Sequence, residues 1–349
     1  MALNIAFYVH HHGSGHLMRT LQILRHLKNN KIILFGSGLS EVDKLPDNVE
    51  LVHLPLDVPE ASQQALSEQR DLSMLHYAPL LVSGITDRVA ILTAAFKKFF
   101  PLILVVDVSV EVTLLARLSG IPTIVVRQHG QRMDAAHLMA YESAEKLIAP
   151  FSNSLHIEKE DWVFKKTVFT GGFSRFDGKK SNLAIVKNRI AILIGSGGSS
   201  INSKFINHLA SECTGFEFHI LGKISPGEHL ANVRYLQHCT DPFDELSKAA
   251  IIIGNTGHNT VMEVASLNKH FIGIPELRPF FEQEEKAASI KSRSGVEIIH
   301  PLEIYQVNWP QILSDLCQSE VDWDGVIRED AVENFADAIT DTAQELGIG

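Results

Sequence analysis

The chain has 349 residues, of which 45% are hydrophobic and 21% are charged, a composition typical of a globular protein with more than one domain. Its formal net charge of −10 argues against a nucleic-acid-binding protein, which needs a basic surface to replace phosphate counterions. No apolar run reaches the roughly 18 to 20 residues that cross a bilayer, and the first residues lack the basic start of a signal peptide. We therefore expect a cytoplasmic protein.

Short runs rich in Val and Ile alternate with helical patterns in the first half of the chain. Such runs are typical of buried parallel strands. They cover residues 3–9, 31–36, 49–54, 102–108, 122–128 and 146–151. The pattern predicts a first domain of alternating strands and helices over residues 1–170.

The alternating pattern stops at residues 170–184, where Gly, Ser and Lys accumulate, and then starts again. We interpret residues 171–188 as a linker and residues 189–325 as a second domain of the same kind. A last helical segment, residues 326–349, could pack back across both domains. The strands expected in the second domain cover residues 189–195, 216–222, 233–238, 249–254 and 269–275.

The predicted fold class is α/β, with two Rossmann-like doubly wound domains that face a cleft. Doubly wound sheets bind their ligands at the carboxyl ends of their strands. We therefore expect the functional residues directly after predicted strands.

The first predicted strand leads into the sequence VHHHGSGHLMRT, residues 9–20. A metal site is disfavoured because three consecutive histidines would alternate in direction along a strand. A dinucleotide loop is disfavoured because Met18 replaces the third glycine of the fingerprint and no acidic residue ends the second strand. The remaining interpretation is a tight glycine turn before a helix whose N-terminus faces an anion. His16 could then exchange a proton near neutral pH, although it could equally well only cap or pack the turn.

Two glycine-rich turns follow strands of the second half. The sequence GSGGSS, residues 195–200, offers backbone and hydroxyl groups to a phosphate at a helix N-terminus, but it lacks the lysine of a Walker loop. The sequence GNTGHNTVMEVASLNK, residues 254–269, opens another helix and places Glu263 on its first turns, where a carboxylate can accept both hydroxyls of a ribose. Each turn alone could be an ordinary connection between a strand and a helix.

Together with GSGHLMR near the start and PFFEQEEKA at residues 279–287, these turns resemble the GT-B glycosyltransferases. The resemblance is to the group that includes the UDP-N-acetylglucosamine transferase of peptidoglycan lipid synthesis. It implies that Glu263 binds the nucleotide ribose and that Gln283 contacts the donor sugar. It also implies that the first glycine turn, with His16, lies on the acceptor and diphosphate side.

The resemblance predicts an inverting, metal-independent transfer of a sugar from a nucleotide diphosphate sugar, with UDP as the expected nucleotide. The expected acceptor is a carbohydrate or a lipid-linked sugar, and no cofactor is expected. His16 is the first candidate for the base, with Asp107 or His129 as alternatives at strand ends, although Asp107 could instead cap a helix. The candidate residues on the sugar-donor side are Gly13, Gly15, Arg19, Ser196, Gly197, Gly198, Ser199, Thr256, Gly257, His258, Asn259, Thr260, Glu263, Glu282 and Gln283.

Two other functions stay open at this point. The GxGHxxR form of the first turn also resembles the UDP-sugar hydrolase of pseudaminic acid synthesis, which shares the fold and transfers the sugar to water. A protein that binds sugar nucleotides without catalysis is the third possibility. A lipid-linked acceptor would bring the protein to the inner face of the membrane, where the basic and aromatic residues 97–100 could make a peripheral contact. The DxD within residues 321–325 is interpreted as a solvated turn, and no metal site is predicted.

Overall fold

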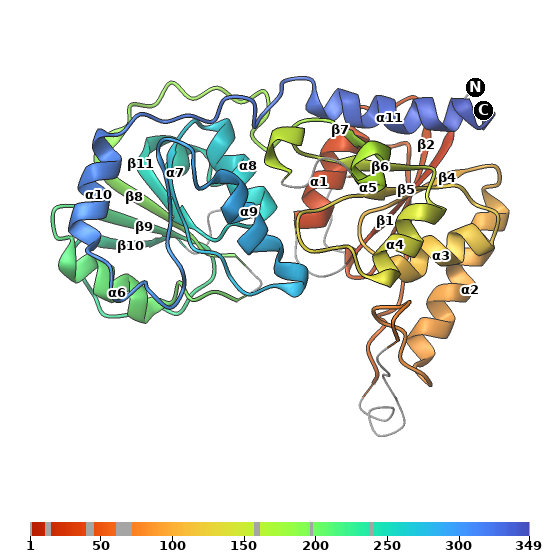
Figure 1. Cartoon of the computed structure of the whole chain (residues 1–349), viewed down its shortest axis with the longest axis horizontal. Coiled ribbons are helices and arrows are strands. Elements are labelled where there is room, and N and C mark those ends of the chain that lie inside the picture. Colours follow the sequence, from red (N-terminus) through yellow and green to blue (C-terminus); the bar gives the residue numbers. More distant parts are fainter. Residues whose placement is uncertain are drawn as a thin grey trace.

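The protein folds into two α/β domains that lie side by side, each built on a parallel sheet with helices on its faces (Figure 1). This computed structural model describes residues 2–10, 15–39, 45–60, 72–156, 161–195, 198–236 and 241–348. The predicted pair of Rossmann-like doubly wound domains is confirmed. None of the helices in these ranges is long and apolar enough to cross a membrane.

The first domain contains a seven-stranded sheet in which every pair of neighbouring strands is parallel. The strands are β1 (Asn4–Val9), β2 (Lys31–Gly36), β3 (Val49–His53), β4 (Ile103–Val106), β5 (Thr123–Val126), β6 (Lys146–Ala149) and β7 (Thr167–Phe169). They lie in the order β3-β2-β1-β4-β5-β6-β7, so β2 and β3 are added on one side of β1, and the strands from β4 onward are added on the other side. The first six strands match the predicted runs. The edge strand β7 has no predicted counterpart, because three half-buried residues carry no recognisable period.

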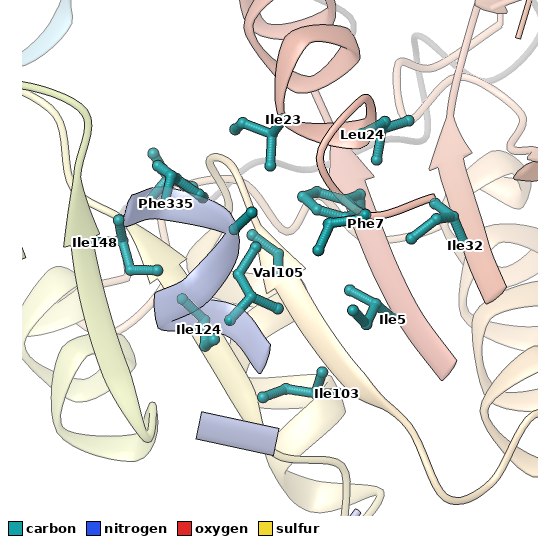
Figure 2. Packing of buried hydrophobic residues seen from close by; sticks show 14 of the residues in the cluster. Ile5, Phe7, Ile23, Leu24, Ile32, Ile103, Val105, Ile124, Ile148 and Phe335 are labelled. Carbon is teal, nitrogen blue, oxygen red and sulfur yellow. The ribbon is translucent and has the colours of Figure 1, made fainter. Parts of the chain in front are cut away.

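Helices cover both faces of this sheet because successive side chains along a strand point to opposite sides. On one face, Ile5 and Phe7 of β1 belong to the same buried cluster as Phe335 of the C-terminal helix α11 (Ala331–Glu345), and Figure 2 shows Val105 of β4 between β1 and Phe335. On the other face, Ala6 and Tyr8 pack with apolar residues of α2 and α3. The helices of this domain are α1 (Gly15–Leu24), α2 (Ser83–Lys98), α3 (Val110–Leu118), α4 (Ala135–Ser143), η2 (Asn153–Leu155) and α5 (Trp162–Lys166).

The second domain repeats the architecture with a six-stranded parallel sheet in the order β10-β9-β8-β11-β12-β13. Its strands are β8 (Val186–Leu193), β9 (Glu217–Leu221), β10 (Val233–Leu236), β11 (Ala249–Gly254), β12 (His270–Gly273) and β13 (Val296–Ile298). Its helices are α6 (Ser203–Glu212), α7 (Phe243–Lys248), α8 (His258–Ser266), η3 (Pro279–Phe281), α9 (Glu282–Ile290) and α10 (Trp309–Gln318). Only β13, another three-residue edge strand, has no predicted counterpart.

Two chain segments connect the domains and pair with each other. The N–H group of Gly172 donates to the carbonyl of Val326, and the N–H group of Arg328 donates to the carbonyl of Gly172, each at 3.0 Å. Phe173 and Phe176 are buried, so the start of the predicted linker is packed rather than solvated. The strand β8 begins at residue 186, three residues before the predicted start of the second domain.

The last helix, α11, lies over the first domain (Figure 1). Its residues Phe335 and Ile339 are buried in the same cluster as Ile148 of β6. The segment expected to pack across both domains, residues 326–349, begins with Val326 in a buried cluster of mostly second-domain residues and continues as α11 on the first sheet.

Candidate functional site

The loops that follow β1, β4, β8 and β11 line one cleft between the two domains, with a volume of about 1730 Å³. β1 and β4 are neighbours in the first sheet, and β8 and β11 are neighbours in the second. Between the two strands of each pair, the direction in which the chain adds strands to the sheet reverses. Ligands of doubly wound sheets bind at such points, because the loops there diverge and leave a crevice. The fold thus places the candidate residues of both halves around one space.

His16 and Asp107 meet on the first-domain side of the cleft. His16 lies on the first turn of α1, and Asp107 directly follows β4. The Nδ1 atom of His16 lies 2.7 Å from Oδ2 of Asp107, and the guanidinium of Arg19 pairs with the other carboxylate oxygen. Because Nδ1 faces the carboxylate, Nε2 is the ring nitrogen that can take a proton from a ligand in the cleft, which His16 lines.

The two alternative bases, Asp107 and His129, are held in different ways. Burial raises the pKa of Asp107, but the charges of Arg19 and His16 lower it by more, so that its pKa lies well below the usual range. A carboxylate this acidic is a weak base at neutral pH. His129 is buried outside the cleft lining, with Nε2 3.2 Å from the carbonyl oxygen of Leu155, and burial lowers its pKa. Of the three, His16 and Asp107 line the cleft next to each other, whereas His129 lies outside its lining.

The second domain turns the N-terminus of α8 toward the cleft, where its first residues His258, Asn259 and Thr260 line the surface. A Cβ atom at Gly15 would lie 2.8 Å from Nδ2 of Asn259, so a side chain at this position would collide unless Asn259 moved. Glycine therefore lets the start of α1 approach the start of α8. Two helix N-termini at one cleft favour an anionic ligand.

Glu263 lies one turn further along α8 and is 92% removed from solvent, with a relative exposure of 8%. Its carboxylate forms an ion pair with Arg175: Oε2 accepts a hydrogen bond from a terminal guanidinium nitrogen at 3.2 Å, and Oε1 lies 2.9 Å from Nε. Burial raises the pKa of Glu263, and the charge of Arg175 offsets part of that effect. Arg175 belongs to the stretch that was interpreted as a linker, and no spacing rule in the sequence connects it with Glu263.

The GSGGSS turn after β8 is bound by a carboxylate of the protein itself. Oε1 of Glu276 accepts hydrogen bonds from the hydroxyl groups of Ser199 and Ser200 at 2.8 Å and from the N–H group of Ser200 at 2.6 Å. The hydroxyl of Ser199, expected to face a phosphate, is thus engaged by Glu276. Ser196 and Gly197 of the same turn lie outside the described residues. Sequence patterns gave no signal for Glu276, which follows β12.

The segment around η3 and the start of α9 ties the second domain to the first. The N–H group of Gln131 donates to the carbonyl of Phe280 at 2.7 Å, and the N–H group of Gly130 donates to Glu285 at 2.8 Å. Glu282, expected to contact the donor sugar, lies 3.5 Å from the guanidinium of Arg132. The loop after β5 therefore fixes the position of this wall of the cleft.

Gln283 lines the cleft from the first turn of α9. Its Oε1 accepts a hydrogen bond from the N–H group of Glu276 at 2.9 Å, and its carbonyl accepts one from the hydroxyl of Thr256 at 2.8 Å. The side-chain nitrogen of Gln283 is the part that can serve a ligand. The hydroxyl of Thr256 is fully buried and already bonded, so it does not face the cleft.

The cleft continues into the first domain as a chamber bounded by α2, α3 and α4. Its charged side chains include Asp57, Arg88 and Glu111, and Oδ2 of Asp57 lies 3.6 Å from the guanidinium of Arg88. Arg88 donates to the hydroxyl of Ser37 at 2.7 Å, and Glu111 accepts the N–H groups of His76 and Tyr77 at 2.7 and 2.9 Å. The remaining wall is mostly apolar. It includes Ile85, Val89, Leu92, Val110, Val112, Leu115, Ala140 and Tyr141.

Within the described ranges, one group of side chains has the spacing of a metal site: His76, Asp134 and His137, whose ligand atoms lie within 4.8 Å of one another. Hydrogen bonds explain the cluster, because Asp134 faces Nε2 of His76 at 2.8 Å and Nδ1 of His137 at 2.5 Å. The guanidinium of Arg132 lies 3.1 Å from the other nitrogen of His137, and burial lowers the pKa of His137 to about 4. We assign no metal to this cluster. The DxD at residues 322–324 forms an exposed turn.

The cleft gathers most of the residues that the sequence singles out. His129 and Thr256 are absent from its lining, and Gly13, like Ser196 and Gly197, lies outside the described residues. The candidate residues that line it are Gly15, His16, Arg19, Asp107, Gly198, Ser199, Gly257, His258, Asn259, Thr260, Glu263, Glu282 and Gln283.

Comparison with known proteins finds the same fold in solved structures. No family model and no curated protein matches the sequence. The glycotransferase of kitacinnamycin superposes with a TM-score of 0.71 and 16% identity, covering 98% of this chain and 99% of the other. MurG of Acinetobacter baumannii superposes with a TM-score of 0.62 and 15% identity, covering 98% of this chain and 100% of the other. UGT2 of Phytolacca americana, in complex with UDP-2-fluoro-glucose and pterostilbene, superposes with a TM-score of 0.65 and 14% identity, covering 99% of this chain and 98% of the other. Over its whole length the chain therefore has the two-domain GT-B fold of these glycosyltransferases.

Proposed function

We propose that the protein transfers a sugar from a nucleotide diphosphate sugar, with UDP as the nucleotide, to a hydroxyl group of an acceptor. One observation carries the proposal. A His–Asp pair on the first domain faces, across one cleft, a helix N-terminus and a buried carboxylate on the second. Solved proteins with the same fold are described as glycosyltransferases, one of them in complex with a UDP-sugar analogue.

We place the nucleotide on the second domain. The diphosphate lies at the N-terminus of α8, where backbone N–H groups and the side chains of Asn259 and Thr260 can donate hydrogen bonds. The ribose lies at Glu263. Arg278 and Lys223 also line the cleft and add positive charge. These groups can offset the charge of a departing diphosphate, so we propose a reaction that needs neither a metal ion nor a cofactor.

The chemical step is proposed as a single displacement. The acceptor oxygen attacks the anomeric carbon from the face opposite the diphosphate, and the configuration of that carbon inverts. As the new C–O bond forms, Nε2 of His16 takes the hydroxyl proton, and the nucleotide diphosphate leaves with the electrons of the broken C–O bond. Asp107 holds the imidazole through Nδ1 and stabilises its charged form, while Arg19 keeps Asp107 ionised.

We place the acceptor in the chamber of the first domain. The mostly apolar wall supports an acceptor with a substantial apolar part, such as a lipid-linked sugar, rather than water. A hydrolase needs room only for a water molecule beside the anomeric carbon, whereas this chamber extends between three helices. Its apolar wall is the observation that favours the transferase over the hydrolase.

The test measures what accepts the sugar. The protein is incubated with a panel of UDP-sugars, with and without a cell lipid extract, and UDP release is followed. We expect slow release that increases at least tenfold when the extract supplies the acceptor. Fast release that does not depend on the extract would identify a hydrolase. No release, together with no UDP binding in calorimetry, would overturn the proposed function.

A further inference from the structure

A lysine that the proposed chemistry does not use lies directly behind the wall of the cleft. Lys286 follows Gln283 by one turn on the buried side of α9 and has a relative exposure of 1%. Within the described part of the chain its Nζ atom has no hydrogen-bond partner, and it lies 5.1 Å from the centre of the Phe151 ring. An unpaired buried ammonium group is strongly unfavourable, so this position calls for an explanation.

The groups around Lys286 come from both domains and are mostly basic. Arg19 of α1 and Glu282 of α9 act on it with opposite charges. After burial, the charge of Lys286 is the largest cause that lowers the pKa of His129, which follows β5, and of His258, which opens α8. The two short helices next to α9, η2 and η3, contain no titratable side chain. Glu282 itself faces Arg132. Glu284 and Glu285 precede Lys286 on the same helix, and Glu285 accepts a hydrogen bond from the N–H group of Gly130, but among the charges of the described residues that shift the pKa of Lys286, Glu282 is the only acidic one.

Burial is the main cause that lowers the pKa of Lys286, to about 7. Arg19 lowers it further, and Glu282 raises it. A new negative charge nearby would shift the lysine toward its charged form. The cleft is the place where such a charge can arrive, because the Phe151 ring that Nζ approaches at 5.1 Å lies 6.4 Å from the ring of His258, which opens α8 and lines the cleft.

We propose that Lys286 takes up a proton from solvent when a nucleotide diphosphate binds at the N-terminus of α8. The inference rests on the proposed function and deepens it. Above pH 7 the lysine of the free protein is largely neutral and carries little buried charge. In the complex it is a cation behind the wall of the cleft, and its charge stabilises the charge that the diphosphate gains as the glycosidic bond breaks. Lys286 is a positioning residue, since it acts on the ligand through the wall of α8.

The experiment measures proton uptake directly. UDP is titrated into the protein at pH 8 by calorimetry in two buffers that differ in ionisation enthalpy. At this pH the terminal phosphate of UDP, with a pKa of about 6, is already ionised and releases almost no proton. A rise of the lysine pKa by about one to two units gives an uptake of roughly 0.4 to 0.8 proton per UDP bound.

Two variants and a matched control assign the proton. Lys286→Met and Lys286→Gln should abolish the uptake, and they should flatten the decrease in UDP affinity that the wild type shows between pH 7 and pH 9. Lys269→Met is the control, because Lys269 is also buried with a pKa lowered to about 8, but it donates to the carbonyls of Ser247 and Ala249 outside the cleft lining. The control should keep the uptake of the wild type.

The outcomes separate this inference from the proposed function. UDP binding without proton uptake, or with uptake that persists in both Lys286 variants, overturns the role of Lys286 and leaves the proposed function intact. If UDP does not bind at all, both fall together. Loss of the uptake in one folded variant of Lys286, with the uptake retained in Lys269→Met, supports the inference.

Discussion

Replacing Glu263 by Ala should weaken UDP binding without unfolding the protein. Its carboxylate has about four lone-pair positions, and the hydrogen bond from the terminal nitrogen of Arg175 uses one of them, so positions remain for the ribose hydroxyls. A hydrogen bond to a charged group contributes about 1.5 to 3 kcal/mol, so the variant should bind UDP roughly ten- to a hundredfold more weakly. The loss of the Arg175 pair should change stability only slightly, because the Arg175 side chain is 32% exposed and solvent screens the pair.

A thermodynamic cycle shows whether the lost contact involves the ribose. Calorimetry is carried out on the wild type and Glu263→Ala with UDP and with its 2′,3′-dideoxy analogue. The wild type should prefer UDP by about tenfold or more, and the variant should have lost this preference. Glu245→Ala serves as the control, because Glu245 is also paired, with Nδ1 of His219 at 2.8 Å, but lies outside the cleft lining. Equal preference for UDP in wild type and Glu263→Ala would refute the assignment.

Three further substitutions test the site. His16→Ala should lower turnover, measured as UDP release, by a factor of roughly 10² to 10⁴, while the UDP affinity measured by calorimetry stays nearly unchanged. Near wild-type turnover in a folded variant would exclude His16 as the base. Asp107→Asn should lower the free energy of unfolding at pH 7 by about 3 to 5 kcal/mol, because it leaves buried Arg19 without its carboxylate. Since the folded-state pKa of Asp107 is lowered, this stabilisation is complete above the unfolded pKa of about 4 and falls by about 1.4 kcal/mol per pH unit as the pH drops toward the folded-state pKa. Urea denaturation should therefore give a difference that is smaller at pH 3 than at pH 7 by roughly 1 kcal/mol, and equal differences would contradict the argument. Lys286→Met should stabilise the protein at pH 7. Because the folded-state pKa of Lys286 lies below the unfolded value, the free energy of unfolding of the wild type should rise by about 1.4 kcal/mol per pH unit above pH 7, and the variant should lack this rise. Parallel curves of stability against pH for the two proteins would disprove the argument.

The sequence by itself determines the two sheets and the turns that line the cleft. Runs such as residues 103–106 and 249–254 are apolar on both sides of the strand, which is typical of a buried parallel strand, and they appear in the structure at the expected positions. Glycine-rich turns after these strands also follow from local chemistry, so that Gly15, His16 and Glu263 are recognisable without a structure. The edge strands β7 and β13 escape this reasoning, because edge strands this short have no period to read.

Only the tertiary structure decides which side chains meet across the cleft. His16 and Asp107 are 91 positions apart, and Arg175 and Glu263 come from different segments, so no periodicity relates them. The same holds for Glu276, whose carboxylate binds the serine turn, and for Lys286, which follows two glutamates in the sequence although its own side chain is buried. The helix and strand periods of a sequence predict which side chains share one face of the same element. Which side chains of different domains pair or become buried depends on how the two sheets are arranged relative to each other.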